Sequence, residues 1–208
     1  MIGCCAGPLG AGEEDAPCAS IALTPGGART IWSPPQAQAP ERVIEDLPDP
    51  AAFATLIIDG QMPDAAIAMA SAFRSAGKPV LLDAGSWKPG MERLVTLATE
   101  IIASAAFKLP GEKDTLTSLI DAGADFAAVT ADDRPVCWRD RRGETGCVEP
   151  PRVEAVDTLA AGDVPHGAYA FHRWCEGGSC QAALAAAARV ASRSVTAYGP
   201  RNGVLAAR

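Results

Sequence analysis

Thr-Leu-Ile-Ile-Asp at 55–59 and Pro-Val-Leu-Leu-Asp at 79–83 are two short apolar runs that bracket a segment of helical composition from 64 to 76. Neither run alternates between apolar and polar residues, as expected for parallel strands that are buried on both faces. Gly77 stands where a glycine commonly ends a helix. The stretch therefore predicts a strand–helix–strand unit with two parallel strands.

The same pattern continues along the chain beyond this unit. Strands alternate with helices, and such alternation predicts a layered α/β fold with a mostly parallel sheet. The further elements that we predict are a helix over 89–98, a strand near 101–102, a helix over 113–122 and a strand over 126–130.

The N-terminal part of the chain has a different character. Two short runs, 19–24 and 28–32, flank Pro-Gly-Gly, a connection that suits two antiparallel strands, so we predict a hairpin there. Residues 1–17 are rich in Gly, Ala and Pro and show no regular period, which predicts a flexible lead-in. The Pro- and Gln-rich stretch 33–50 is typical of a surface connection.

Beyond residue 130 the pattern changes again. Apolar residues at 136–138 and near Val148 border a charged turn, which predicts a short antiparallel excursion from the sheet. Two helices, over 163–175 and 179–193, are expected to close the chain. We assign all of these elements to one domain over 18–208, because a chain of 208 residues is close to the usual size of a single domain.

Composition and charge narrow the class of protein. Hydrophobic residues make up 48% of the sequence and charged residues 21%, which is ordinary for a soluble globular protein. The net charge of −7 comes from interspersed acids and bases, so we expect neither nucleic acid nor an anionic membrane surface as a partner. No apolar stretch approaches the ~20 residues that span a bilayer.

The cysteines and the N-terminus bear on the compartment. Seven cysteines are an odd number for a disulfide framework, and the sequence contains no two Cys-x-x-Cys pairs. We therefore expect reduced, structural thiols. The first seven residues contain neither a basic residue nor a leucine-rich run, so we expect no signal peptide and a cytoplasmic location.

The segment 153–163 carries the predicted chemistry. An apolar strand is expected to end at Val156, a turn of small residues follows, and a helix begins at Asp163. The free amides of a first helical turn and the helix dipole attract an anion, and small side chains at 160–162 let a phosphate come close. Asp163 beside such an anion suits a general base for an attacking hydroxyl, although spacing alone favours an ordinary helix N-cap.

The run Asp-Thr-Leu-Ala-Ala-Gly-Asp at 157–163, followed by His-Gly-Ala at 166–168, resembles the C-terminal signature of the ribokinase-like (pfkB) carbohydrate kinases. The resemblance covers about 18–208 and implies a three-layer α/β/α fold. It also implies ATP-dependent phosphorylation of a sugar hydroxyl with Mg²⁺, in which Asp163 is the catalytic base. The backbone that would form the anion hole for the transferred phosphate belongs to Ala160, Ala161 and Gly162.

The resemblance implies further sites and an assembly. The closing segment 195–203 is similar to the family's segment beside the nucleotide, and the 19–32 hairpin is similar to a lid that pairs two subunits of a homodimer. Segments 83–89 and 103–107 look more like the ketohexokinase-like branch than like other branches. The implied nucleotide-binding residues are Thr130, Gly162, Gly199 and Asn202, and the implied ligands of a monovalent cation, K⁺, are Asp157, Leu159 and Gly199.

Two departures from the family pattern support a second hypothesis. The turn at 130–135 reads Thr-Ala-Asp-Asp-Arg-Pro, where the family usually has Thr-x-Gly-x-x-Gly beside the nucleotide. The N-terminal third of the family pattern, with its Gly-Gly-x-x-x-Asn sugar-binding motif, has no counterpart in this sequence. The alternative is therefore a truncated or degenerate, non-catalytic paralogue that binds nucleotide weakly or acts only through association.

Overall fold

The computed structural model describes residues 20–23, 29–32, 47–199 and 201–205, and the chain divides into two compact units, Met1–Asp46 and Leu47–Arg208. In the first unit, strand β1 (Ser20–Leu23) pairs antiparallel with strand β2 (Arg29–Trp32). This pair confirms the two strands of the predicted hairpin. The predicted lead-in 1–17, the turn at 25–27 and most of the connection 33–50 lie outside the described residues.

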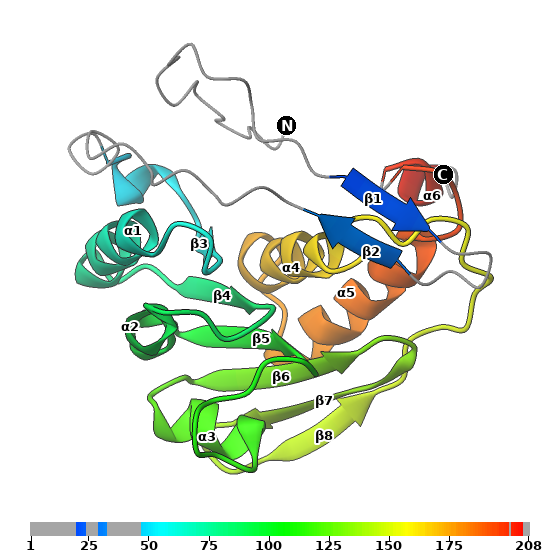
Figure 1. The fold of residues 1–208 in the computed structure, drawn as a ribbon. Helices are drawn as coiled ribbons and strands as arrows, with labels where there is room; N and C mark the ends of the chain where they lie inside the picture. The colour runs from blue at the N-terminus through cyan, green and yellow to red at the C-terminus, as the bar shows by residue number, and fades with distance from the viewer. Residues whose placement is uncertain (1–19, 24–28, 33–46, 200, 206–208) are drawn as a thin grey trace. The chain divides into compact units, whose positions relative to one another are not determined.

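The second unit is built on a six-stranded sheet whose strand order follows the chain (Figure 1). The first four strands are parallel and the last two join antiparallel, which confirms the mostly parallel sheet and the antiparallel excursion. The strands are β3 (Leu56–Ile58), β4 (Val80–Ala84), β5 (Glu100–Ser104), β6 (Phe126–Ala131), β7 (Arg134–Asp140) and β8 (Thr145–Val148).

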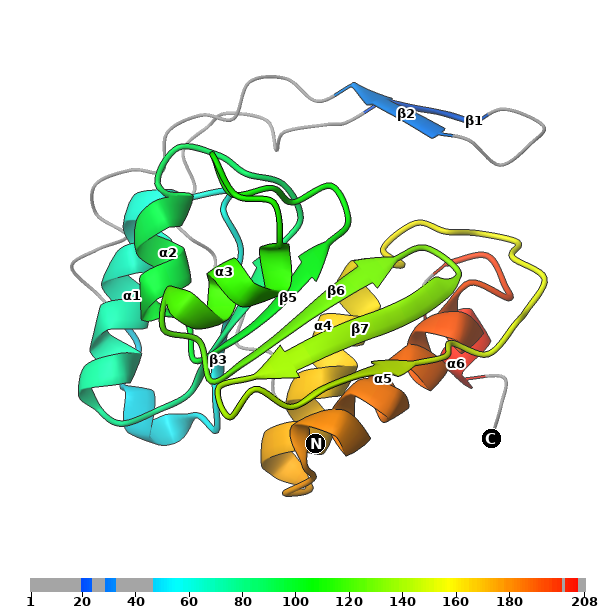
Figure 2. The same cartoon turned by 90° about the horizontal axis from the view of Figure 1, so that it is seen from below.

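Helices cover both faces of this sheet and make three layers (Figure 2). One face carries α1 (Pro63–Ser75), α2 (Met91–Leu97) and α3 (Thr115–Asp121). The other face carries α4 (Asp163–Ala170), a π-helical turn (Phe171–Cys175) and α5 (Cys180–Ser194). A 3₁₀ turn (Pro50–Ala52) precedes β3, and a short helix, α6 (Asn202–Leu205), follows α5.

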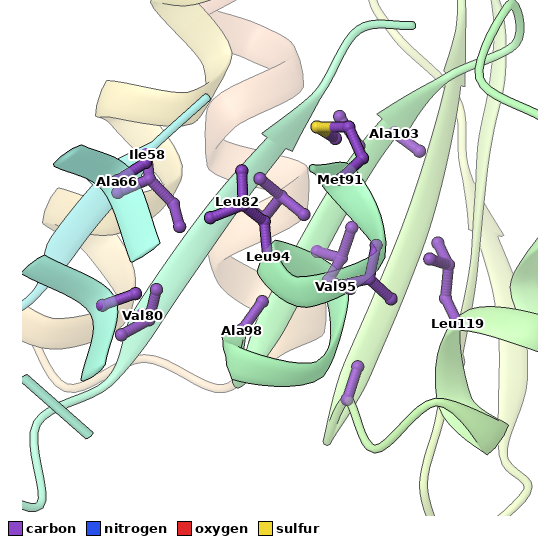
Figure 3. Packing of buried hydrophobic residues seen from close by; sticks show 14 of the residues in the cluster. Ile58, Ala66, Val80, Leu82, Met91, Leu94, Val95, Ala98, Ala103 and Leu119 are labelled. Atoms are coloured by element: carbon purple, nitrogen blue, oxygen red, sulfur yellow. The ribbon is translucent and has the colours of Figure 1, made fainter. Parts of the chain in front are cut away.

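The middle strands show why their sequence is an unbroken apolar run. Val80, Leu81 and Leu82 of β4 are each 0% exposed, yet they belong to two separate hydrophobic clusters. Successive side chains of a strand point to opposite faces, so Val80 and Leu82 pack under α1 and α2 while Leu81 packs toward α4 and α5. Figure 3 shows the first of these clusters, with Leu82 beside Leu94. Burial on both faces replaces the alternation that a half-exposed strand would show.

The end of α1 follows the sequence prediction closely. Gly77 has a φ of +70°, the left-handed conformation that glycine adopts without a steric penalty. Its amide donates to the Arg74 carbonyl at 3.0 Å, and the Lys78 amide donates to the Phe73 carbonyl at 2.8 Å. These bonds satisfy carbonyls that the helix leaves unpaired, so Gly77 is the left-handed residue that follows the C-cap residue Ala76 and ends α1.

The expected strand ending at Val156 is wrong. Residues 149–155 belong to no helix or strand, and Val153 and Val156 are 42% and 49% exposed. Two consecutive prolines, Pro150 and Pro151, lack the amide hydrogens that a sheet ladder needs, so the chain leaves the sheet after β8. The amides of Val156 and Asp157 instead donate to the carbonyl of Val195 beyond α5, at 2.7 and 3.1 Å.

The expectation that all cysteines are reduced is also wrong. Cys137 of β7 and Cys147 of β8 form a disulfide, because the register of the antiparallel pair places them directly opposite each other. The sequence alone shows only that the two cysteines are ten residues apart. The register of the hairpin shows that they face each other. Cys175 and Cys180 are free thiols, as expected. Within the described residues, no helix combines the length and apolar character needed to cross a membrane.

Candidate active site

A cavity of about 420 Å³ lies beside the carboxyl ends of β3 and β4, between α1 and α4. Three carboxylates line it together with a histidine: Asp59 directly after β3, Asp83 in β4, Asp163 at the start of α4, and His166 one turn further along α4. The rest of the lining is mainly apolar. Ligands of open parallel sheets bind outside the carboxyl ends of the strands, so the position of this cavity is that of a substrate site.

Sequence reasoning found only one of these four residues as a site residue. Asp163 belongs to the motif at 157–163, whereas Asp59 and Asp83 are simply the last residues of the two apolar runs 55–59 and 79–83. An aspartate at the end of a buried apolar run is the signal that could have identified both residues, because parallel strands bring their carboxyl ends to one edge of the sheet. His166 lies in the His-Gly-Ala part of the motif, to which the sequence assigns no role, and it is 7% exposed.

The turn before α4 is held by its own backbone. Ala160 has a φ of +58°, a left-handed conformation that alanine rarely adopts. The Ala160 carbonyl accepts the amides of both Asp163 and Val164 at 3.0 Å, and the Ala161 amide donates to the Thr158 carbonyl at 3.2 Å. The motif therefore folds into a tight turn that runs directly into the first turn of α4.

The predicted anion hole is only partly open in this conformation. The Gly162 amide donates to no carbonyl within the part of the chain that the structure describes, whereas the Ala161 amide and the Asp163 amide each have a carbonyl partner. Gly162 also has open space where a Cβ would stand. An anion at this turn would meet the Gly162 amide directly, and it would compete with neighbouring carbonyls for the other two.

The structure brings together the three residues predicted to hold a monovalent cation. The Asp157 carboxylate accepts the Leu159 amide at 2.9 Å through Oδ1 and the Gly199 amide at 3.0 Å through Oδ2. Asp157 thus links the turn before α4 to the loop before α6. No group of three or more His, Cys, Asp or Glu side chains suited to a metal ion occurs among the described residues, and the cation site stays a prediction.

The predicted nucleotide-binding residues come from two places in the fold. Thr130 lies near the end of β6, where its hydroxyl donates to the Ala103 carbonyl of β5 at 3.4 Å. Gly199 has a φ of +80°, and the side-chain amide of Asn202 donates to the Tyr198 carbonyl at 2.6 Å, which closes the loop before α6. The Asp157 bond connects Gly199 to the α4 turn, whereas the Thr130 hydroxyl bonds to β5.

The turn after Thr130 keeps the backbone shape that a glycine would give it. Asp132 has a φ of +55° at the position where the family pattern has glycine. Aspartate tolerates this conformation better than most residues, because its short side chain can hydrogen-bond locally. The aspartate thus replaces the glycine without removing the left-handed turn, and it adds a negative charge there.

His166 is tied to its surroundings by both ring nitrogens. Its Nδ1 lies 2.6 Å from the Gly162 carbonyl oxygen and 3.4 Å from Oδ2 of Asp83, and its Nε2 lies 3.2 Å from the Ile102 carbonyl oxygen of β5. Burial raises the pKa of Asp83 above its ordinary value of 3.8, and the nearby charges of Asp163 and Asp59 act in the same direction. The positive charges of His166 and Lys88 oppose that rise.

A second polar cluster holds the far end of α4. The Glu100 carboxylate at the start of β5 is 4% exposed and accepts hydrogen bonds from the Tyr169 hydroxyl, from Arg173 Nε at 3.0 Å and, more weakly, from Cys180 Sγ at 3.7 Å. Burial, together with the neighbouring Glu100 charge, raises the pKa of Tyr169 well above its usual range, so this hydroxyl stays a donor. The cluster joins β5 to α4, the π-helical turn and α5, and so fixes the helix that carries Asp163.

Solved structures share this fold. A protein from Agrobacterium tumefaciens assigned as a ribokinase has a TM-score of 0.71 and 26% identity over 89% of this chain and 63% of its own. An Arabidopsis thaliana ribokinase complexed with ribose and ATP has a TM-score of 0.70 and 21% identity, over 88% and 64%. An E. coli protein assigned as a ribokinase II, in complex with ATP and Mg²⁺, gives 0.71 and 19%, over 89% and 67%.

These likenesses define a ribokinase-like α/β/α protein, as the sequence predicted. The family model of the pfkB family carbohydrate kinases matches residues 12–207. The chain belongs to the pfkB family of carbohydrate kinases. It spans 63% of the length of the Agrobacterium protein, and among curated protein sequences none matches it.

Proposed function

We propose that this chain carries the phosphoryl-transfer site of an ATP-dependent carbohydrate kinase, with Asp163 as the general base. One observation supports this most: Asp163 begins α4 next to the Gly162 amide, which has no carbonyl partner among the described residues, and lines the cavity at the carboxyl ends of the parallel strands. A base and an anion-binding amide in adjacent residues are what transfer to a hydroxyl requires.

In the proposed reaction, a sugar hydroxyl in the cavity attacks the γ-phosphorus of ATP. Asp163 accepts the hydroxyl proton as the new P–O bond forms, and the bond to the ADP oxygen breaks. The backbone amides of 160–162 and the N-terminal end of α4 would stabilise the charge on the transferred group. The loop that contains Gly199 and Asn202, together with Thr130, is the proposed nucleotide side of the site.

The proposed cofactors follow from the solved relatives, which include complexes with ATP and with Mg²⁺. Mg²⁺ would neutralise phosphate charge, and it usually keeps several waters and takes few protein ligands. The described residues contain no group of three or more metal-binding side chains, which fits an ion that is held mainly by waters and phosphate oxygens. A K⁺ ion at Asp157, Leu159 and Gly199 remains part of the proposal.

The cavity favours an uncharged acceptor. Asp59, Asp83 and Asp163 can accept hydrogen bonds from sugar hydroxyls, and no Lys or Arg is among the described residues that line the cavity. A sugar phosphate would meet repulsion from these carboxylates, so neutral polyhydroxy compounds are the expected substrate class. Ketohexoses rank first among them, because the segments 83–89 and 103–107 look ketohexokinase-like.

The test is transfer of labelled γ-phosphate from ATP to a panel of neutral ketoses and aldoses, with sugar phosphates as a comparison. Asp163→Asn should lower kcat by about 10²- to 10⁴-fold, the usual contribution of a general base. Calorimetry with Mg-ATP on both proteins measures nucleotide binding separately. Equal rates for both proteins would exclude Asp163 as the base, and Mg-ATP binding without any transfer would favour the non-catalytic alternative.

A further inference from the structure

The two ring nitrogens of His166 have partners that can only accept hydrogen bonds. The Gly162 carbonyl lies 2.6 Å from Nδ1 and the Ile102 carbonyl lies 3.2 Å from Nε2. A carbonyl oxygen has no hydrogen to give, so each nitrogen must carry the proton of its own bond. A ring that makes both bonds is therefore the imidazolium, a cation at a buried position.

The surroundings of this ring are suited to a positive charge. Asp83 of β4 has a carboxylate oxygen 3.4 Å from Nδ1. Asp59 after β3 and Asp163 on the same helix add negative charge around Asp83, and Lys88 is the positive group there, while β5 contributes the Ile102 carbonyl. A buried cation is tolerated only where it is paired and hydrogen-bonded, and His166 meets both conditions.

The bond to Gly162 bears directly on Asp163. The Gly162 carbonyl and the Asp163 amide belong to the same planar peptide unit, so a group that fixes the carbonyl also fixes the backbone from which the Asp163 side chain projects. Glycine is the residue least able to hold its own conformation. The His166 side chain adds a second hold on this turn beside its backbone bonds from the Asp163 and Val164 amides to the Ala160 carbonyl, so loss of the side-chain bond should loosen the direction of the Asp163 carboxylate.

We propose that His166 is a positioning residue for Asp163: as an imidazolium it clamps the Gly162 carbonyl to β5 and so holds Asp163 and the Gly162 amide toward the cavity. This proposal rests on the proposed function of Asp163 as the general base. His166 touches no reacting atom in this scheme, because its ring is occupied by the two carbonyls and by Asp83.

Two amide variants separate the two bonds of the ring. In His166→Asn the side-chain amide nitrogen stands near the position of Nδ1 and can still donate to Gly162. In His166→Gln it stands near the position of Nε2, so the bond to Ile102 can persist while the Gly162 clamp is lost. His172→Gln is the matched control, because His172 follows on the same helical segment and its Nδ1 pairs with Glu176 at the surface.

The kinetic expectation is a split between kcat and KM. A displaced base lowers the rate of the chemical step, so His166→Gln should lower kcat by about 10- to 100-fold with the KM for ATP little changed. His166→Asn should recover most of that loss, and His172→Gln should match the wild-type protein. Equal kcat values in the Asn and Gln variants would overturn the proposal.

Two further measurements do not need activity, so they keep this proposal separate from the proposed function. Hydrogen exchange of the Asp163 and Val164 amides should be at least tenfold faster in His166→Gln than in His166→Asn, since both amides report on the first turn of α4. The ¹⁵N spectrum of the wild-type His166 ring should show a proton on both nitrogens. Similar exchange in the two variants, or a ring with one bare nitrogen, would overturn the clamp even if transfer is observed. A wild-type protein that shows the clamp but transfers no phosphate would instead count against the proposed function.

Discussion

Replacing Ala160 with glycine should stabilise the protein, although it removes a methyl group. Ala160 has a φ of +58°, where the Cβ of an L-residue is crowded by the backbone. Glycine has no Cβ and reaches this conformation without strain. The substitution keeps every backbone amide of the proposed anion hole, so the change in stability can be measured without removing the site.

The expected magnitude comes from two opposing contributions. A left-handed conformation costs an L-residue about 1–2 kcal/mol, which glycine would recover. Glycine also makes the unfolded chain more flexible, which costs about 0.4–1 kcal/mol. The net gain in the free energy of unfolding should therefore be about 0.5–1 kcal/mol, or an increase in Tm of about 2–3 °C for a domain of this size.

Gly77 provides the reverse experiment in the same molecule. Its φ is +70°, and a Cβ built there meets nothing within 4 Å, so Gly77→Ala adds backbone strain without a collision. The two substitutions should change the free energy of unfolding by similar amounts with opposite signs. Urea unfolding of both variants measures this as shifts of the midpoint at constant m value. A lower midpoint for Ala160→Gly, with Gly77→Ala behaving as expected, would refute the argument from backbone strain.

Three further predictions concern stability. Glu100→Gln should lower the free energy of unfolding by about 2–3 kcal/mol, because it leaves the 30%-exposed guanidinium of Arg173 without its charged partner, whereas Asp125→Asn, in an exposed ion pair, should cost less than about 1 kcal/mol. The stability difference between Asp83→Asn and wild type should shift in favour of the variant as pH rises above 3.8 and through the raised native pKa of Asp83, with no such shift below 3.8, as measured by urea unfolding across that range. Gly203→Ala should cost about 1–3 kcal/mol, because its Cβ would stand 2.0 Å from the Arg193 carbonyl oxygen of α5.

The outcomes that would contradict these three predictions are equally specific. Equal Tm losses for Glu100→Gln and Asp125→Asn would show that burial of the first pair adds nothing. A pH-independent difference between Asp83→Asn and wild type would mean that Asp83 ionises alike in the folded and unfolded chains. Gly85→Ala is the control for Gly203→Ala, because a Cβ at Gly85 meets nothing within 4 Å, and equal costs for the two would rule out the collision.

Much of the fold could be predicted because the central strands are buried on both faces. Two kinds of local feature carried the prediction: the apolar runs that form β3 and β4, and the glycine that ends α1. The neighbouring elements pack in the way that these features require. The strand expected before Asp163 was wrong for a non-local reason: whether Val153 to Val156 pairs depends on a neighbouring strand, and Pro150 and Pro151 lead the chain away from any.

The candidate site also combines residues that a local motif identifies with residues that only the fold brings together. Asp163 and its turn are contiguous in sequence, so a motif could identify them. Asp59, Asp83 and His166 come from three different elements, and only the parallel sheet brings them to one cavity. The left-handed conformation of Ala160 and the pairing of Cys137 with Cys147 left no periodic signal in the sequence, because each depends on the backbone geometry of a single turn or hairpin.

The disulfide between β7 and β8 closes a covalent ring that contains the end of β7, the turn and the start of β8. Its two cysteines are ten residues apart, and closing a loop of that length removes unfolded-state entropy worth about 3 kcal/mol. The exposed residues Arg141 and Arg142 lie inside this ring. A trypsin cut there would leave the two halves of the chain attached to each other, so the nicked protein would migrate as one molecule until a reductant releases two fragments.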